Sequence, residues 1–153
     1  MATYNSTRFT ANGANSSRNV ASPAHGMHND LKVIYFEVAF TAAWTSSDTV
    51  NLGWVPAGFR VLGTFCGSDD MDSGTTLTWD IGDAGDQDRL VAAQTTGQTN
   101  SVAYQMRAQG TSLGFGYKYT ADTLITATAV GSPATTTGTI KVALFGLLEG
   151  VAS

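Results

Sequence analysis

Acidic residues gather in one part of this chain. Seven of its twelve Asp and Glu residues lie between positions 69 and 88. Loops rich in carboxylate oxygens are common ligands of Ca²⁺. The last four are spaced D-x-x-D-x-x-D-x-D, which differs from the D-x-D-x-D-G-x₅-E pattern of an EF-hand loop. A calcium site is therefore one interpretation of this stretch, although its spacing does not match that motif.

The other interpretation is a structural turn. Gly82 and Gly85 allow a tight bend, Asp side chains accept hydrogen bonds from their own backbone, and a cation follows at once. We therefore predict a structural loop without a bound metal, in which Arg89 neutralises one carboxylate. The loop residues are Asp80, Asp83, Asp86, Asp88 and Arg89.

Residues that could support catalysis are few and scattered. His25 and His28 lie three positions apart, whereas a metal site needs three or four ligands and a catalytic triad needs a histidine beside its nucleophile. Cys66, the single cysteine, lies in the apolar run RVLGTFC and is most simply a small buried side chain. Glu37 and Glu149, the only glutamates, are far apart for a glycosidase pair. We predict no catalytic site, no metal, no cofactor and no enzymatic activity.

Aromatic residues are the remaining group with binding chemistry. Six of them could line a sugar site, but aromatic side chains more often fill cores and interfaces. A carbohydrate-binding module is therefore kept as the alternative. The six residues are Trp44, Trp54, Trp79, Tyr104, Tyr117 and Tyr119.

The elements that must position these residues have the pattern of short strands. Between positions 75 and 80, Leu77 and Trp79 alternate with polar residues, as in a half-buried strand. Turn signals recur about every 8–12 residues, and no convincing amphipathic helix is present. The class is all-β: an antiparallel β-sandwich or jelly roll of about eight strands. The other predicted strands are 31–40, 49–55, 59–66, 117–120, 123–130 and 139–148. Residues 89–94 are a short apolar segment, and 102–108 is undecided between a strand and a helical turn.

Two of these segments, 31–40 and 139–148, are apolar at both odd and even positions. Strands that are buried on both faces have this composition. We therefore predict that the strand of residues 31–40 is central in its sheet or covered on both sides. Other copies of the chain could supply part of that cover.

Residues 1–30 differ from the rest of the chain. Their apolar residues are isolated, so the segment alone cannot bury enough surface to order itself. It is either a loose terminus or an extended N-terminal arm that orders against another subunit, with Tyr4 and Phe9 as anchors. We divide the chain into this arm and a folded body of residues 31–153.

The composition excludes several classes of function. Charged residues make up 13% of the chain, against about 25% in an ordinary soluble domain. The formal net charge of −4, without a basic stripe, argues against nucleic acid. No run of about 18 apolar residues predicts a membrane span. The start MATYNSTRF lacks the apolar core of a signal peptide, which predicts folding in a cytoplasm.

Three stretches of the chain are distinctive in combination: Val55–Leu62 (VPAGFRVL), Leu77–Arg89 (LTWDIGDAGDQDR) and Tyr119–Thr123 (YTADT). Together they resemble a group of small structural proteins encoded beside the capsid genes of tailed phages. The resemblance implies a virion protein of the decoration, or cement, type: a β-sandwich or jelly roll, often trimeric, made in the bacterial cytoplasm. Its expected partners are the major capsid protein on the capsid exterior and its own copies, and it would stabilise contacts between neighbouring capsomers. The alternative is a carbohydrate-binding or host-adhesion module displayed on a head or tail fibre.

Overall fold

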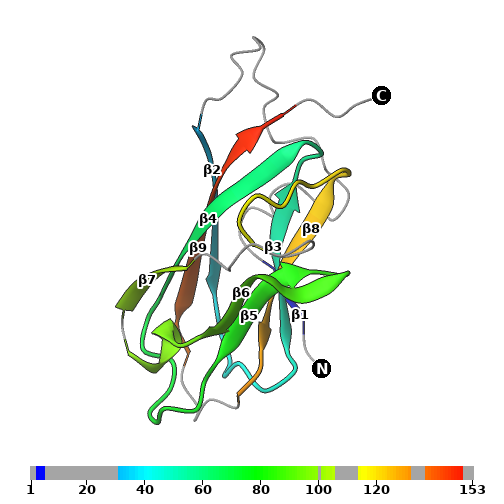
Figure 1. The fold of residues 1–153 in the computed structure, drawn as a ribbon. Coiled ribbons are helices and arrows are strands. Elements are labelled where there is room, and N and C mark those ends of the chain that lie inside the picture. Colours follow the sequence, from blue (N-terminus) through cyan, green and yellow to red (C-terminus); the bar gives the residue numbers. More distant parts are fainter. Residues whose placement is uncertain (1–2, 6–30, 100, 106–113, 132–136, 150–153) are drawn as a thin grey trace.

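The computed structural model describes residues 3–5, 31–99, 101–105, 114–131 and 137–149. Within these residues the chain forms nine strands and one short 3-10 turn (Figure 1). The strands are β1 (Thr3–Asn5), β2 (Leu31–Ala39), β3 (Thr49–Val55), β4 (Phe59–Ser68), β5 (Trp79–Asp83), β6 (Asp86–Gln94), β7 (Ser101–Gln105), β8 (Thr123–Ala129) and β9 (Thr139–Leu148), and the turn is η2 (Thr96–Gln98).

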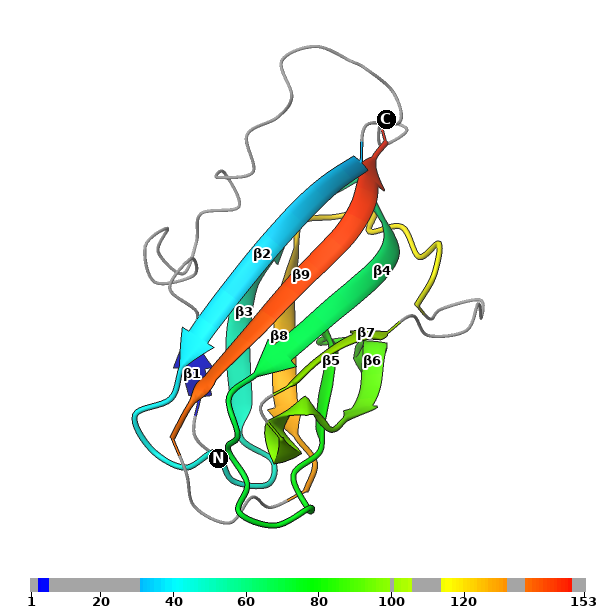
Figure 2. The same cartoon turned by 90° about the vertical axis from the view of Figure 1, so that its left-hand side faces the viewer.

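The strands form two sheets. One has the order β1-β3-β8-β5-β6 and the other has the order β2-β9-β4-β7. Neighbouring strands within the described residues are antiparallel, except that β1 is parallel to β3. Figure 2 shows the four-stranded sheet in front of the five-stranded one. Strands β2–β9 thus form an all-β sandwich, which confirms the predicted class, and β1 joins one of its edges.

Alternation along the strands turns one face of each sheet into the core. Every second side chain of β2 is buried from Ile34 onward, and β9 pairs with β2 residue by residue and follows the same period. Trp44 and Trp79 are fully buried, and the ring of Trp44 lies 5.0 Å from that of Phe40 and 5.9 Å from that of Trp79. The core therefore connects β2 and the loop after it to β5 in the opposite sheet.

Strand β2 lies at a sheet edge, which corrects one prediction. Its one neighbour among the described strands is β9, and its outward side chains Leu31, Val33 and Tyr35 are 46–58% exposed. The prediction of a central strand, or one covered on both faces, is therefore wrong for a single chain. Strand β9 occupies the central place because it pairs with β2 on one side and β4 on the other.

Two shorter segments also differ from their sequence patterns. Residues 101–105 form strand β7, which decides the 102–108 segment in favour of a strand; positions 106–108 lie outside the described residues. Residues 117–120, predicted as a strand, contribute one isolated bridge, between Lys118 and Arg60 of β4. Backbone bonds to β4 surround this bridge, but Gly116, with a φ of 83°, breaks the extended chain just before it.

The predicted loop 80–88 is a hairpin. Strand β5 runs to Asp83 and β6 begins at Asp86, so only Ala84 and Gly85 form the turn. Strand β5 begins at Trp79, four residues after the start of the alternating pattern at position 75. The reason lies in the backbone N–H groups of Thr76 and Leu77, which donate to the Asp72 carboxylate instead of to a sheet partner.

The hairpin contains a large bulge. Ile81 pairs with Val91 and Asp83 pairs with Asp86, so that Gly82 alone in β5 stands opposite residues 87–90 of β6. Bulges of this kind bend a strand and re-aim its side chains. Here the bulge places Arg89 within reach of Asp83 at the hairpin tip.

Gly82 provides the space that this bulge needs. A Cβ atom at Gly82 would overlap the backbone carbonyl of Asp86. We expect Gly82→Ala to lower the free energy of unfolding by about 1–3 kcal/mol, the usual cost of overpacking, measured by urea denaturation. Gly74→Ala is the matched control, because a Cβ there meets only Asp72 Oδ1 at 3.4 Å. Equal losses in the two variants would contradict the prediction.

Candidate interaction surfaces

The outer face of the β2-β9-β4-β7 sheet is apolar. Its side chains project away from the core, and Val102 at 73% exposure and Leu31 at 58% are the most exposed of them. Isolated exposed apolar residues are ordinary, but a contiguous set marks an interaction surface. This set, called the apolar face below, consists of Leu31, Val33 and Tyr35 of β2, Phe65 of β4, Val102 and Tyr104 of β7, and half-buried Phe145 of β9.

Strand register makes the apolar face continuous. Tyr35 pairs with Ala143, Ala143 with Phe65, and Phe65 with Tyr104, so that one row crosses all four strands. The ring of Phe65 lies 4.8 Å from that of Tyr104 and 5.2 Å from that of Phe145. Aromatic pairs at these distances stabilise each other, so the face is a preformed surface rather than a set of independent side chains.

Charged groups flank the apolar face at both ends. At one end, exposed Glu37 and Lys141 lie opposite each other on β2 and β9. At the other end, Arg60 donates two hydrogen bonds to Glu149, at 2.6 and 2.9 Å, and the ammonium of Lys118 lies 3.4 Å from the same carboxylate. The hydrogen bond from Arg60 holds the pKa of Glu149 below its usual value. An apolar centre with a charged rim is the usual anatomy of a protein–protein interface.

A buried ion pair anchors the tip of the β5-β6 hairpin. The Nε atom of Arg89 donates to Asp83 Oδ2 at 2.5 Å, and both side chains are more than 90% buried. The Asp83 carboxylate also accepts the N–H groups of Gly85 and Asp86. The guanidinium lies 4.3 Å from the ring centre of Tyr117, a cation–π distance. The pair therefore connects the hairpin to the segment that precedes β8.

Burial and hydrogen bonding act in opposite directions on this pair. Burial alone would raise the pKa of Asp83, but the hydrogen bonds from Arg89, Gly85 and Asp86 outweigh it and hold that pKa below its ordinary value. Burial alone would lower the pKa of Arg89, and the bonds to Asp83 reverse that effect. Both groups are therefore charged at neutral pH, in the geometry of a structural staple.

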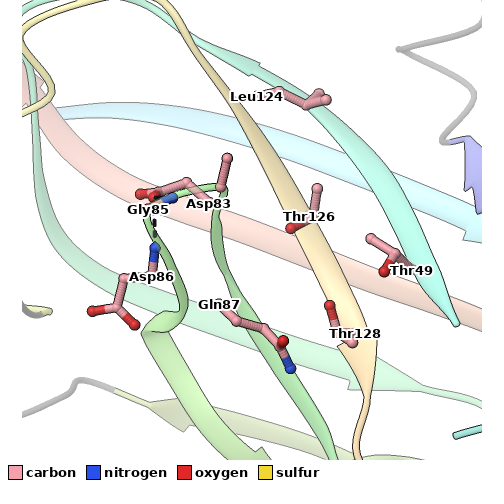
Figure 3. A pocket seen from close by; sticks show the side chains of 9 residues that line it. Thr49, Asp83, Gly85, Asp86, Gln87, Leu124, Thr126 and Thr128 are labelled. Atoms are coloured by element: carbon pink, nitrogen blue, oxygen red, sulfur yellow. Dashed lines mark hydrogen bonds between the residues drawn. The ribbon is translucent and has the colours of Figure 1, made fainter. Parts of the chain in front are cut away.

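A hollow lies beside the hairpin tip. Its volume is about 360 Å³, and it opens between the turn residues and the outward threonines of β3 and β8 (Figure 3). A second hollow of about 260 Å³ shares Thr49, Gln87 and Thr128 with it. The lining of the first is Thr49, Asp83, Ala84, Gly85, Asp86, Gln87, Leu124, Thr126 and Thr128.

The other predicted loop carboxylates are dispersed along the hairpin. Asp80 accepts the N–H of Ala93 at 2.7 Å, and burial together with neighbouring Asp88 raises the pKa of Asp86. The described residues contain no group of three or more His, Cys, Asp or Glu side chains placed to hold a metal ion. Upstream, Asp72 accepts backbone N–H groups of Gly74, Thr76 and Leu77.

The remaining candidates occupy several different places. The backbone of Tyr4 lies opposite Val50 in the β1–β3 pair, whereas Phe9, His25 and His28 lie outside the described residues. Burial raises the pKa of the Cys66 thiol to about 12.

The aromatic residues considered for a sugar site do not form one exposed surface, although Trp44 contacts Trp79 and Tyr117 contacts Tyr119. Trp44, Trp79 and Tyr119 are buried, Tyr104 lies on the apolar face, and Tyr117 packs against Arg89. The two-sided pattern of residues 31–40 and 139–148 indicated an apolar surface that other copies could cover, but it did not indicate that β4 and β7 contribute Phe65, Val102 and Tyr104 to it.

Comparison with known proteins assigns the chain to the virion. It is 31% identical to a chain of the cyanophage Pam1 capsid asymmetric unit, over 90% of this chain and 96% of that one, with a TM-score of 0.69. The chain belongs to a family of phage capsid proteins. The predicted resemblance to phage virion structural proteins is thereby confirmed, and this capsid protein has a structural role in the virion.

Two further phage structures share the fold of this capsid protein. A chain in the capsid of Ralstonia phage GP4 is 24% identical, with a TM-score of 0.70 over 99% of this chain and 100% of that one. A chain in the acid-stable capsid of Helicobacter pylori bacteriophage KHP30 is 12% identical, with a TM-score of 0.56 over 80% and 91%. No protein-family model and no curated protein matches the chain. In its described part, no helix is long and apolar enough to cross a bilayer.

Removing Arg89 tests whether the hairpin is held by an ion pair or by a metal. Arg89→Ala leaves the buried Asp83 carboxylate without its cation, and we expect a loss of about 3–5 kcal/mol in the free energy of unfolding. Addition of EDTA to the wild-type capsid protein should leave its melting temperature unchanged. A fall in melting temperature that Ca²⁺ reverses would establish the calcium interpretation instead.

The depressed pKa of Asp83 predicts a particular acid dependence. The unfolded chain takes up this proton near the ordinary pKa of 3.8 and the folded chain only at lower pH. The stabilisation is therefore complete above about pH 4 and is lost as the pH falls through the folded-state value. Asp83→Asn should have a flatter loss of stability below pH 4, measured by urea unfolding between pH 2 and 7. Parallel curves for the variant and the wild type would refute this assignment.

Proposed function

We propose that this protein is a capsid decoration, or cement, protein. It binds the outside of the shell formed by the major capsid protein, as a homotrimer, and stabilises the contacts between neighbouring capsomers. The observation that carries the proposal is the apolar face, because stable monomers rarely expose a contiguous set of seven apolar side chains on the outside of one sheet. Copies of the same chain cover this face in the trimer.

The composition of the apolar face supports such a contact. Aromatic residues are enriched at protein interfaces, and Tyr35, Phe65 and Tyr104 contribute three of them here. Full burial of one large apolar side chain contributes about 1.5–3 kcal/mol, before the cost of association is subtracted. A few such side chains per protomer are enough to hold a trimer without any buried charge.

Low charge supports repeated assembly. With a formal net charge of −4 and 13% charged residues, neighbouring copies repel each other weakly. Each protomer then adds modest contacts to the shell, and a trimer combines three sets of them, so that avidity determines the strength of attachment. Assembly on the capsid exterior follows synthesis in the bacterial cytoplasm, and the division into an arm of residues 1–30 and a body of residues 31–153 belongs to the same proposal.

Charge introduced on the apolar face tests the proposal. Val33→Asp with Val102→Asp places two carboxylates at exposed positions, so the monomer fold is retained while burial between copies becomes costly. Val130→Asp is the matched control, because Val130 is 49% exposed but lies outside the apolar face. We expect a light-scattering mass of three chains for the wild type and the control, and of one chain for the double variant.

The same variants are then added to undecorated particles, and the bound copies are counted after washing. Occupancy should fall at least tenfold for the double variant and remain at the wild-type level for Val130→Asp. A wild-type mass of one chain at micromolar concentration would overturn the trimer. Equal occupancy of the double variant and the wild type would overturn the role of the apolar face.

A further inference from the structure

The N-terminal strand occupies the open edge of the five-stranded sheet. Thr3, Tyr4 and Asn5 pair in parallel with Thr49, Val50 and Asn51 of β3. This is the one parallel pair among the described strands, and parallel pairs cannot be joined by a hairpin. Strand β1 must therefore be joined to the body by a long connection.

The length of β1 fits the acceptor edge. The register of β3 with β8 shifts between Asn51 and Gly53, and such a bulge twists the edge beyond it. The regular part of the β3 edge that β1 covers therefore ends at Asn51, where β1 also ends. Without β1, the N–H and C=O groups of this edge would be open to pairing with another chain.

The connection from β1 to the body is much longer than a return within one chain requires. Strand β1 pairs with the start of β3, next to the Ala39 end of β2, while the connection must begin at Leu31, the other end of β2 (Figure 2). Nine residues of β2 span about 30 Å, whereas the twenty-five residues 6–30 extend to about 85 Å at most. The same segment can therefore reach the β3 edge of a neighbouring copy.

The starting point of the connection favours the neighbour. Leu31 is 58% exposed and belongs to the apolar face, so the segment leaves the body where the proposed trimer brings another copy closest. The backbone contacts of β1 on β3 are the same in both arrangements, which is the condition under which an element is exchanged at low cost. Exchange adds a connection between protomers that a strand folded back on its own chain does not provide.

We infer that β1 is exchanged between copies: the strand Thr3–Asn5 of one protomer adds to the β3 edge of the next protomer in the ring. This inference rests on the proposed homotrimer. The partner is a second copy of this chain, and the surface that it fits is the backbone edge Thr49–Asn51 of β3.

Disulfide trapping distinguishes exchange from folding back. Thr3→Cys with Thr49→Cys places cysteines at directly opposed positions of neighbouring strands, about 4.8 Å apart and within disulfide range. Cys66→Ala in the same chain removes the native thiol. The assembled protein is oxidised, denatured and examined on a non-reducing gel. Exchange predicts covalent dimers and trimers, which reduction converts to single chains.

Two single-cysteine chains sharpen the test. When Thr3→Cys and Thr49→Cys chains, both with Cys66→Ala, are refolded together, a disulfide between them can form only across protomers. Each chain oxidised alone controls for random pairing. If light scattering shows a trimer but the double-cysteine chains run on the gel as single chains, with an internal disulfide or with none, exchange is overturned and the trimer stands. A mass of one chain before oxidation would overturn the trimer and the exchange with it.

Discussion

Both faces of the β2-β9-β4-β7 sheet are apolar, and a two-layer sandwich can bury only one of them. The inward face, with Phe36, Val142 and Leu144, packs against the five-stranded sheet and is almost completely removed from water. The outward row from Tyr35 to Tyr104 has no cover within the described residues. Folding of one chain therefore buries one face of this sheet and leaves the other exposed, and the proposed trimer would remove that second face from water.

The buried pair of Asp83 and Arg89 solves a different problem, at the far edge of the other sheet. Strand β6 ends that sheet, and its bulge leaves four residues without regular partners in β5. An ion pair of this kind adds little net stability over an apolar pair of the same volume. The pair instead fixes the geometry of the hairpin tip. One carboxylate accepts hydrogen bonds from the turn N–H groups and from the guanidinium, so that the tip has one conformation.

A structural role in a virion agrees with the different uses that the chain makes of its apolar and its acidic side chains. The chemistry of the chain is used to satisfy its own backbone: Asp72 and Asp83 bond turn N–H groups, and Asp69 accepts the N–H of Thr139. The apolar face and the proposed exchange of β1 act through buried area and backbone pairing, with charged groups only at the rim of the face. Such contacts suit the proposed subunit that is repeated many times on one shell.

The residues alone were enough for the class of fold, since alternation and turn-forming residues act locally: β3 and β9 have their predicted bounds, and β2 differs by one residue. They also indicated that Arg89 would neutralise a carboxylate, but four Asp carboxylates lie within nine residues of it in the sequence. The bulge opposite Gly82 determines that Arg89 pairs with Asp83. Strand order could not be predicted, because the pairing of β9 with both β2 and β4 joins residues that are far apart in the chain. For the same reason only the tertiary structure placed β2 at an edge, gathered Phe65, Tyr104 and Phe145 into one surface, and gave β1 its place on β3.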